Sequence, residues 1–240
     1  HDHGLSPPPD MQIRLRQVAL VAADLSDVEA DIGERLGLRP CYRDPGVARF
    51  GLHNVLFPVG EQLLEVVSPT EPDTTAGRLL DKRGGDGGYM VILQVDDLGP
   101  HRRRFDQTGA RVVFEGAVEG ITGLHLHPRD VGGAILSVDR ADDWDSWPWA
   151  GADWRRHVCT DVVQGIRAVE VQAADPAAMA GRWSEVLGIP NQGTKLPLDE
   201  GEVRFVEALD GRGEGVSGLE LAASRNARFE LGGVRVSLVP

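Results

Sequence analysis

The chain has 240 residues, 41% of them hydrophobic, and a formal net charge of −12. This hydrophobic share is enough to build a buried core and excludes a disordered chain, while the acidic balance excludes nucleic acid and anionic membranes as favoured partners. No run of eighteen apolar residues occurs, so no membrane span is expected. We predict a cytoplasmic protein, a monomer or a homodimer, with a small-molecule ligand.

The first ten residues, HDHGLSPPPD, lack the apolar stretch of a signal peptide. We expect residues 1–10 to be a disordered tail or an expression remnant, with a natural start at Met11. The cysteines, Cys41 and Cys159, have no metal-binding or redox spacing and are expected to be reduced thiols.

An alternating strand, a turn and a helix are predicted for residues 18–38, VALVAADLSDVEADIGERLGL. A similar block, VEVQAADPAAMAGRWSEVLGI, follows at residues 169–189, offset by 151 positions without a gap. In this second block Asp175 suits the N-cap, Pro176 the first helical position and Gly188 the helix end.

A weaker copy lies between these blocks, as a strand at residues 90–98 followed by a polar helix at 99–108. The pattern of strand, helix and strand therefore begins near residues 17, 90 and 168. The remaining strands of the first two copies are predicted at Leu38–Arg43, Ala48–Pro58, Gln62–Val67, Arg111–Glu115, Gly123–His127 and Ala134–Asp139.

The glycine-rich run RGGDGG at residues 83–88 is expected to link the first two copies. A phosphate-cradling loop of the P-loop type would need a Lys-Ser/Thr pair after its glycines, and none follows. Four tryptophans crowd residues 141–158, and they are expected to pack between domains or, alternatively, to form a lid that stacks on a ligand. Residues 202–240 offer three short strands.

These elements predict an α+β protein of repeated βαβββ modules that form curved, mostly antiparallel sheets with helices on the outer face. We expect paired modules at residues 11–140, a Trp-rich linker at 141–158, and at 159–240 a third module plus a truncated fourth one that lacks its helix. The uncovered, curved face of the sheet is the expected place for a ligand.

The pattern of paired modules resembles the vicinal oxygen chelate superfamily, which includes glyoxalase I, methylmalonyl-CoA epimerase, extradiol dioxygenases and antibiotic-resistance proteins. Three stretches carry this resemblance: AADL at residues 22–25, FPVGEQLLEVVSP at 57–69 and LHPRDVGGAIL at 126–136. The resemblance implies the fold and a small-molecule site. It does not imply one activity, because members of this superfamily differ widely in chemistry.

Members of this superfamily usually hold one divalent metal with four side chains, two from first strands and two from last strands of paired modules. The resemblance places Gln17 and Met90 at the first-strand positions, and Glu65 and Ser137 at the last-strand positions. Gln17 and Glu65 offer oxygen ligands, whereas the thioether of Met90 and the hydroxyl of Ser137 are poor ones. The cofactor prediction therefore stays open between one divalent metal (Ni, Mn, Zn or Fe) and none.

His125 and His127 stand two apart on a predicted strand, so both side chains are expected on one face. They either join Gln17 and Glu65 as metal ligands or catalytic acid and base, or they serve the turn and the core.

Three further positions are candidates for the pocket or for its counterpart in the third module. His53 and Gln94 are candidate pocket residues on neighbouring strands. Glu207 in RFVEA is a candidate echo of Glu65, with Ala168 as its partner position.

We predict a glyoxalase-like lyase or isomerase, or a dioxygenase-type enzyme, that acts on a small oxygenated metabolite. Its expected catalytic residues are Glu65, His125 and His127, and its expected substrate-binding residues are Gln17, His53, Met90, Gln94 and Ser137. The alternative is a non-catalytic protein that sequesters a small molecule, as resistance members of the superfamily do. A third hypothesis is a degenerate module whose concave face is filled by large side chains.

Overall fold

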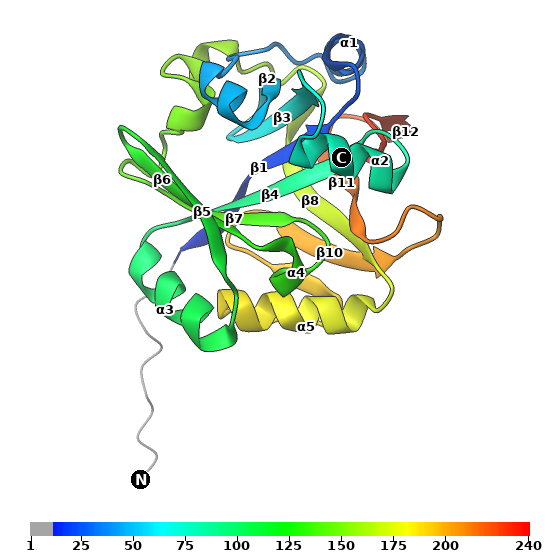
Figure 1. Ribbon diagram of the computed structural model, residues 1–240. Coiled ribbons are helices and arrows are strands. Elements are labelled where there is room, and N and C mark those ends of the chain that lie inside the picture. The colour runs from blue at the N-terminus through cyan, green and yellow to red at the C-terminus, as the bar shows by residue number, and fades with distance from the viewer. Residues whose placement is uncertain (1–11) are drawn as a thin grey trace.

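The computed structural model describes residues 12–240, so the tail predicted for residues 1–10 and the start at Met11 lie outside the described residues. Two sheets occupy the centre, and Figure 1 shows helices around their periphery. The N-terminal sheet has seven strands in the spatial order β2-β3-β1-β4-β7-β6-β5: β1 (Ile13–Val21), β2 (Leu52–Val59), β3 (Gln62–Pro69), β4 (Gly87–Val95), β5 (Val112–Val118), β6 (Ile121–Leu126) and β7 (Ile135–Ala141). The C-terminal sheet has six strands in the order β12-β13-β11-β8-β10-β9: β8 (Val163–Ala173), β9 (Lys195–Pro197), β10 (Glu202–Glu207), β11 (Gly215–Ala223), β12 (Ala227–Leu231) and β13 (Val234–Val239). The helices are α1 (Leu25–Leu36), α2 (Thr75–Arg83), α3 (Leu98–Thr108), α4 (Pro128–Val131) and α5 (Pro176–Leu187), with three short 3₁₀ helices, η1 (Pro45–Phe50), η2 (Pro148–Ala150) and η3 (Trp154–His157).

The repeat read from the sequence is present in three dimensions. Helix α5 begins and ends 151 residues after α1, and each helix follows the first strand of its unit. Asp175 accepts a hydrogen bond from the backbone N–H of Ala178, and Gly188 has φ 71°, which only glycine adopts without strain. Local capping chemistry thus fixes both ends of the repeated helix.

The two sheets share one topology. In the N-terminal sheet β1 lies antiparallel to β4, and each of these strands pairs in parallel with the last strand of its own unit, β3 or β7. In the C-terminal sheet β8 and β11 are likewise antiparallel, with β10 and β13 as their parallel partners. Seven of the eleven strand pairings are antiparallel, so the α+β prediction is confirmed and the sheets are mixed.

Some predicted elements differ from those observed. The expected strand at Leu38–Arg43 is reduced to a single bridge between Tyr42 and Leu56, and residues 48–50 belong to η1. The first unit therefore has a 3₁₀ helix where the second has a full strand, because Pro45 fixes φ at the first turn and Asp44 caps it by accepting from the N–H of Gly46. Helix α2 is a further element that the sequence pattern did not reveal.

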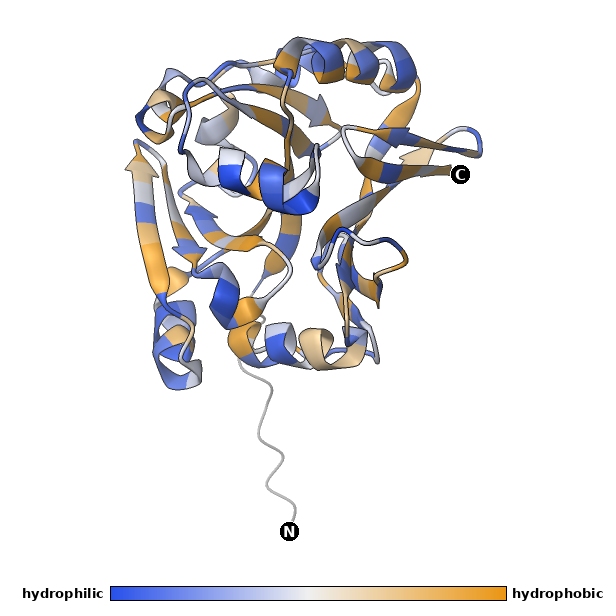
Figure 2. Ribbon diagram, turned by 45° about the vertical axis from the view of Figure 1, so that its right-hand side comes forward, coloured by the Kyte–Doolittle hydropathy of each residue, from blue (hydrophilic) through white to orange (hydrophobic). Residues whose placement is uncertain are grey.

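A shared hydrophobic core joins the two sheets. It contains Leu20 and Val91 from the N-terminal sheet and Val169 and Val216 from the C-terminal sheet. A Cβ at Gly88 would lie 2.0 Å from the Cβ of Val216, so glycine lets β4 and β11 approach closely. Figure 2 shows the matching alternation of hydrophobic and hydrophilic residues along the strands.

The opposite face of the N-terminal sheet is concave and holds a second, smaller apolar cluster. Residues from the segment after β7, Trp147 and Trp154, pack there against Ala19, Leu63 and Ile92. We call residues 142–158 the tryptophan segment. It was expected to pack between domains or to act as a lid on a ligand; instead it packs into the concave face of the N-terminal sheet. Among residues 12–240 no helix is long and apolar enough to cross a membrane.

Candidate functional site

The part of the concave face that the tryptophan segment leaves open is a cavity of about 320 Å³. Its walls come from all seven strands of the N-terminal sheet and from η1, with Phe50, Phe114 and Trp149 among the aromatic side chains. The polar side chains of the lining are Gln17, Asp44, Arg49, Asn54, Glu65, Tyr89, His125 and Asp139.

Glu65 is held in this cavity by neutral donors. Its side chain projects from β3 and is 8% exposed. Oε1 accepts from Nε2 of Gln17 at 2.9 Å, and Oε2 accepts from Nδ2 of Asn54 at 2.7 Å. Burial raises the pKa of the Glu65 carboxyl, and these two hydrogen bonds offset part of that rise. The result is a carboxyl group with increased proton affinity.

Gln17 is fixed from both sides. Its Oε1 accepts from the indole Nε1 of Trp147 at 2.7 Å while its Nε2 donates to Glu65. Trp147 is 1% exposed, so this chain of hydrogen bonds is shielded from water. Gln17 and Asn54 therefore set the orientation of the Glu65 carboxyl group.

Asp139 is a second buried carboxyl group in the same cavity. Oδ2 accepts from the indole Nε1 of Trp149 at 2.8 Å, and Oδ1 accepts from the hydroxyl of Ser137. Burial raises the pKa of Asp139 to about 7, with the two hydrogen bonds opposing the shift. A Cβ on Gly123, its cross-strand neighbour, would lie 2.7 Å from Oδ2 of Asp139, so glycine leaves the room that the carboxyl occupies.

His125 and Arg49 lie on the β5–β6 side of the cavity. Burial, together with the charge of Arg49, lowers the pKa of His125 to about 4, so its imidazole is neutral at pH 7. The Arg49 guanidinium lies 4.9 Å from the ring centroid of Phe50 and 5.1 Å from that of Phe114. Arg49 is thus a cation beside an aromatic opening, and the carboxylate Asp44 lies in the same lining.

The structure brings four of the predicted residues together, since Gln17, Glu65, Met90 and His125 all line the cavity. His127 does not line it. Strand β6 ends at Leu126, and His127 caps α4 by accepting from the N–H of Arg129 at Nδ1. The alternation that would place His125 and His127 on one face stops at Pro128, which begins that helix.

Three further predicted residues lie outside the lining. His53 is exposed, because the residues of β2 that face the cavity are its neighbours Leu52 and Asn54. Ser137 is fully buried and donates to Asp139, and Gln94 is fully buried beneath the tryptophan segment.

The cavity also contains residues that sequence reasoning missed. Asn54 could have been found, since it shares one face of β2 with Leu52 and Leu56, and that face turns toward the cavity. Asp139 shares a face with Ser137, at the end of a correctly predicted strand. Trp147 and Trp149 gave no local signal, because their contacts to Gln17 and Asp139 depend on how the tryptophan segment folds back.

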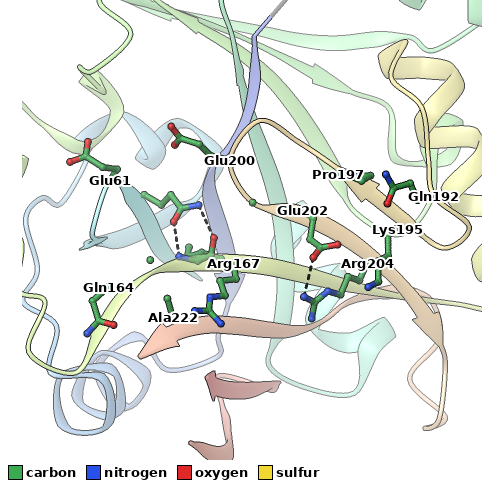
Figure 3. A pocket seen from close by; sticks show the side chains of 14 residues that line it. Glu61, Gln164, Arg167, Gln192, Lys195, Pro197, Glu200, Glu202, Arg204 and Ala222 are labelled. Carbon is green, nitrogen blue, oxygen red and sulfur yellow. Dashed lines mark hydrogen bonds and ion pairs between the residues drawn. The ribbon is translucent and has the colours of Figure 1, made fainter. Parts of the chain in front are cut away.

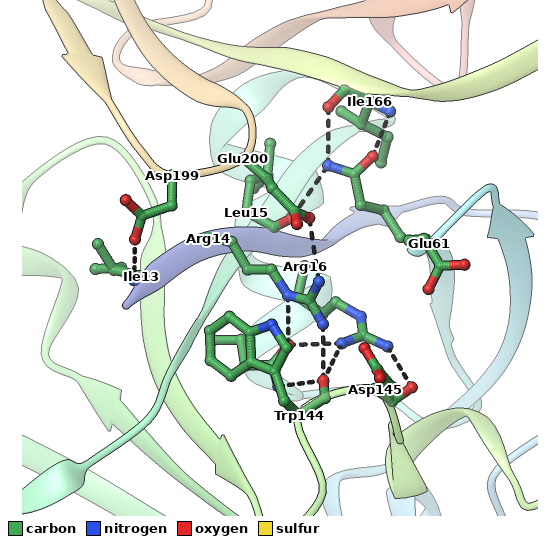
Figure 4. A network of polar contacts seen from close by, with 12 residues as sticks. Ile13, Arg14, Leu15, Arg16, Glu61, Trp144, Asp145, Ile166, Asp199 and Glu200 are labelled. Atoms are coloured by element: carbon green, nitrogen blue, oxygen red, sulfur yellow. Dashed lines mark hydrogen bonds and ion pairs between the residues drawn. The ribbon is translucent and has the colours of Figure 1, made fainter. Parts of the chain in front are cut away.

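Gln94 belongs to a network that fastens the tryptophan segment to the sheet (Figure 4). The backbone oxygen of Trp144 accepts from Nη2 of Arg14 at 2.7 Å, from Nη1 of Arg16 at 3.0 Å and from Nε2 of Gln94 at 2.8 Å. The Arg16 guanidinium lies 5.0 Å from the ring centroid of Trp147, and burial lowers the pKa of Arg16 to about 9. The tryptophan segment is therefore a fixed part of the site.

The donors at the superfamily's metal position do not fit a metal ion. The side-chain oxygen of Gln17 already accepts a hydrogen bond from Trp147, and the thioether of Met90 and the hydroxyl of Ser137 are weak metal ligands. Within residues 12–240 no three side chains of the His, Cys, Asp and Glu types gather closely enough to hold one. We therefore assign no step at this site to a metal.

A second, open hollow of about 610 Å³ lies against the C-terminal sheet (Figure 3). Its carboxylates, Glu61, Glu200 and Glu202, are each ion-paired with an arginine. Arg204, the partner of Glu202, also contacts Glu220, and both contacts measure 3.0 Å. These contacts lower the pKa of Glu220.

Register corrects the expected echo of Glu65 in the third module. Glu65 pairs with Ala19, the residue that precedes Glu170 by 151 positions, and Glu170 pairs with Arg204. The equivalent of Glu65 is thus Arg204, whereas Glu207 pairs with Ala173 at the end of β8. Ala168, the counterpart of Gln17 and the expected partner position of Glu207, pairs with Glu202 instead.

Comparison with known proteins places this chain in a family. Residues 18–187 match the family described as glyoxalase-like domain, which is more than half of the chain. The chain is 26% identical over 131 residues to the mitochondrial methylmalonyl-CoA epimerase of Bos taurus, covering 53% of this chain and 74% of that protein. It is 24% identical over 135 residues to the ethylmalonyl-CoA/methylmalonyl-CoA epimerase of Cereibacter sphaeroides, covering 53% of this chain and 97% of that protein.

Solved structures show the same fold. A hypothetical protein from Staphylococcus aureus superposes with a TM-score of 0.72 at 12% identity, over 96% of this chain and all of that one. A methylmalonyl-CoA epimerase variant from Streptomyces coelicolor, in complex with 2-nitronate-propionyl-CoA, gives a TM-score of 0.50 at 16% identity, over 56% of this chain and all of that one. With the match over residues 18–187, these likenesses show that the chain belongs to the glyoxalase-like domain family of the vicinal oxygen chelate superfamily.

Proposed function

We propose that this protein is a proton-transferring enzyme of the isomerase or lyase type that acts on a small oxygenated metabolite in the cavity lined by Glu65. One observation carries the proposal: Glu65 is a buried carboxyl group that only neutral side chains contact, and burial raises its pKa. A carboxyl group with increased proton affinity is suited to general acid–base catalysis near neutral pH. The epimerase names of the relatives favour an isomerisation over a lyase reaction.

Five polar residues of the lining have a role in this proposal. Glu65 takes a proton from the substrate carbon, and the protonated carboxyl of Asp139, with a pKa of about 7, donates one back to that carbon; in the reverse reaction the two groups exchange these roles. Gln17 and Asn54 are positioning residues for Glu65. The charge of Arg49 selects a substrate with an anionic group, and a cavity of about 320 Å³ suits a small one.

A divalent metal such as Ni, Mn, Zn or Fe is not needed in this scheme, because the proton transfers are assigned to carboxyl groups. His127, His53, Gln94 and Ser137 keep at most indirect roles, since they lie outside the cavity lining. The cytoplasmic location and the monomeric or homodimeric state stay predictions.

The test is hydrogen exchange at carbon. The full chain is incubated in D₂O with small branched carboxylic acids and acyl thioesters, methylmalonyl-CoA first, and loss of the C–H proton signal is followed by NMR. Glu65→Gln should slow exchange by roughly 10²- to 10⁴-fold. His53→Gln, an exposed change on the neighbouring strand, is the matched control and should leave the rate unchanged.

Two outcomes would contradict the proposal. Equal exchange rates in the wild type and in Glu65→Gln would remove Glu65 from the chemistry. Loss of exchange after treatment with a chelator, restored by adding a metal, would show that a metal acts after all.

A second candidate is a non-catalytic protein that sequesters a small anion. It is favoured by the indole groups of Trp147 and Trp149, which already occupy polar atoms of Gln17 and Asp139. Ligands that raise the melting temperature of the wild type, and none of which undergoes exchange, would support sequestration over catalysis.

A further inference from the structure

A separate cavity of about 550 Å³ lies at the junction of the two halves of the chain, away from the site of Glu65. It is bounded by the loop between α2 and β4, by the loop before β11, and by strands β11, β12 and β13. Figure 1 shows α2 beside β11 and β12 at this junction. The glycine-rich run at residues 83–88 supplies one of its walls.

Three arginines line this cavity: Arg83, Arg212 and Arg235. Within residues 12–240 none of the three forms an ion pair with a carboxylate, whereas ten of the twenty other arginines do. Arg83 is 4% exposed, and its Nε finds no acceptor in the described part of the chain. A buried guanidinium without a carboxylate is costly unless an anion completes it.

The backbone is shaped to admit these side chains. A Cβ at Gly215 would overlap Nη1 of Arg83 at 1.1 Å, and Nη1 instead donates to the backbone oxygen of Glu214 at 2.8 Å. Arg212 donates to the backbone oxygens of Arg83 at 2.8 Å and of Gly233 at 2.9 Å. Two like charges are thus held near each other by neutral carbonyl groups, and the proximity of Arg212, after burial, lowers the pKa of Arg83.

The carboxylates around the cavity form no ion pair with Arg83 or Arg212 within 4.0 Å in the described part of the chain, and the charge of Asp210 raises the pKa of Arg83 but does not outweigh burial and Arg212. Asp210 accepts from Nε2 of Gln172 and from the backbone N–H of Arg212. Asp86 accepts from the backbone N–H of Ala23. Glu230 is exposed and stands opposite Arg235 in the β12–β13 pairing.

We propose that this cavity binds a small phosphate-bearing anion, with Arg83 and Arg235 as its ligands and Arg212 as the residue that holds the loop in place. Guanidinium groups match the oxygens of phosphate and carboxylate alike. Phosphate is the better fit here, because Arg83, Arg235 and the hydroxyl of Ser217 reach the cavity from three different segments, and a tetrahedral anion offers acceptors in several directions. The hydroxyl of Ser217, which accepts from Nη2 of Arg235 at 3.4 Å, can donate to the same anion.

The proposal is tested by calorimetric titration of the full chain with inorganic phosphate and with pyrophosphate at constant ionic strength. We expect saturable binding that Arg235→Ala weakens by roughly tenfold or more, since hydrogen bonds between charged groups are the strong ones. Glu230→Gln should tighten binding, because it removes a negative charge beside Arg235. Arg228→Ala, an exposed change on β12 outside the cavity lining, is the matched control and should have no effect.

Arg83→Gln should also weaken binding, and if that variant does not fold, Arg235→Ala and Glu230→Gln decide the question. Absence of saturable heat with either phosphate probe would overturn the proposal. So would an equal loss of affinity in Arg228→Ala, which would indicate a diffuse charge effect. Saturable binding of malonate without binding of phosphate would overturn the choice of phosphate.

Discussion

In the N-terminal sheet Glu65 accepts hydrogen bonds from the amides of Gln17 and Asn54, whereas at the equivalent position of the C-terminal sheet Arg204 is ion-paired with Glu202 and Glu220. Strand order and register are shared, yet the electrostatics are opposite. Burial raises the pKa of Glu65, while the arginine lowers that of Glu220. One fold thus carries a site suited to proton transfer and a face whose charges neutralise one another.

The tryptophan segment accounts for much of this difference. It covers part of the concave face of the N-terminal sheet and keeps water from Gln17, whereas the face of the C-terminal sheet stays open (Figure 3). A carboxyl group in a dry, apolar place gains proton affinity, and one beside a cation in an open hollow loses it. The covering segment, and not the sheet alone, makes the N-terminal cavity a candidate active site.

The largest effect is therefore expected from replacing Trp147, which anchors the tryptophan segment to the N-terminal sheet. Trp147→Ala is expected to cost about 3–5 kcal/mol of unfolding free energy, as for other buried tryptophans, and it leaves Oε1 of Gln17 without its donor. Trp147→Phe, which keeps most of the bulk and loses only the hydrogen bond, should cost about 1–2 kcal/mol. Urea denaturation measures both, and a loss below about 1 kcal/mol for Trp147→Ala would mean that the segment is only loosely held.

The pH dependence of stability should show that the N-terminal cavity holds a carboxyl group with a raised pKa. Asp139 has a pKa of about 7 in the folded protein and of 3.8 as its ordinary value, so the folded state binds more protons between these limits. Unfolding free energy should therefore fall as the pH rises from about 4 to 7, on the order of 4 kcal/mol from this group. Denaturation at several pH values should show a smaller fall in Asp139→Asn, with Asp142→Asn as an exposed control that keeps the wild-type slope. Identical slopes in all three proteins would indicate that Asp139 is ionised in the folded state.

The smallest effect on stability is expected in the C-terminal sheet. Arg204→Met removes the cation between Glu202 and Glu220, both of which are partly exposed, so it should cost only about 1 kcal/mol. Turnover at the N-terminal cavity should not change. A fall in activity comparable with that of Glu65→Gln would show that the two faces are coupled.

Local patterns predicted most of the fold, and long-range contacts account for what they missed. The caps at Asp175 and Gly188 and the offset of 151 residues are properties of short stretches, so the repeated helix could be placed from sequence. The strand expected at Leu38–Arg43 could not, because only Tyr42 bridges to Leu56 there and Pro45 begins a 3₁₀ helix directly afterwards.

The same distinction between local patterns and long-range contacts applies to the residues of the site. Alternation on β1 and β3 placed Gln17 and Glu65 in the cavity, but the resemblance to a metal-binding superfamily could not reveal that Trp147 occupies the oxygen of Gln17. That contact joins residues 130 positions apart, and no local pattern encodes it.

The side chain of Gln62 connects the two sheets by hydrogen bonds to the backbone of both. Its side-chain amide donates to the backbone oxygens of Leu15 and Ile166 and accepts from the N–H of Ile166 at 2.6 Å, so it acts as one more peptide group between β1 and β8. Cutting the chain between the two sheets would leave this amide without its partners in β8 and would expose one side of the shared core. We therefore expect the two halves to unfold together, as one cooperative unit.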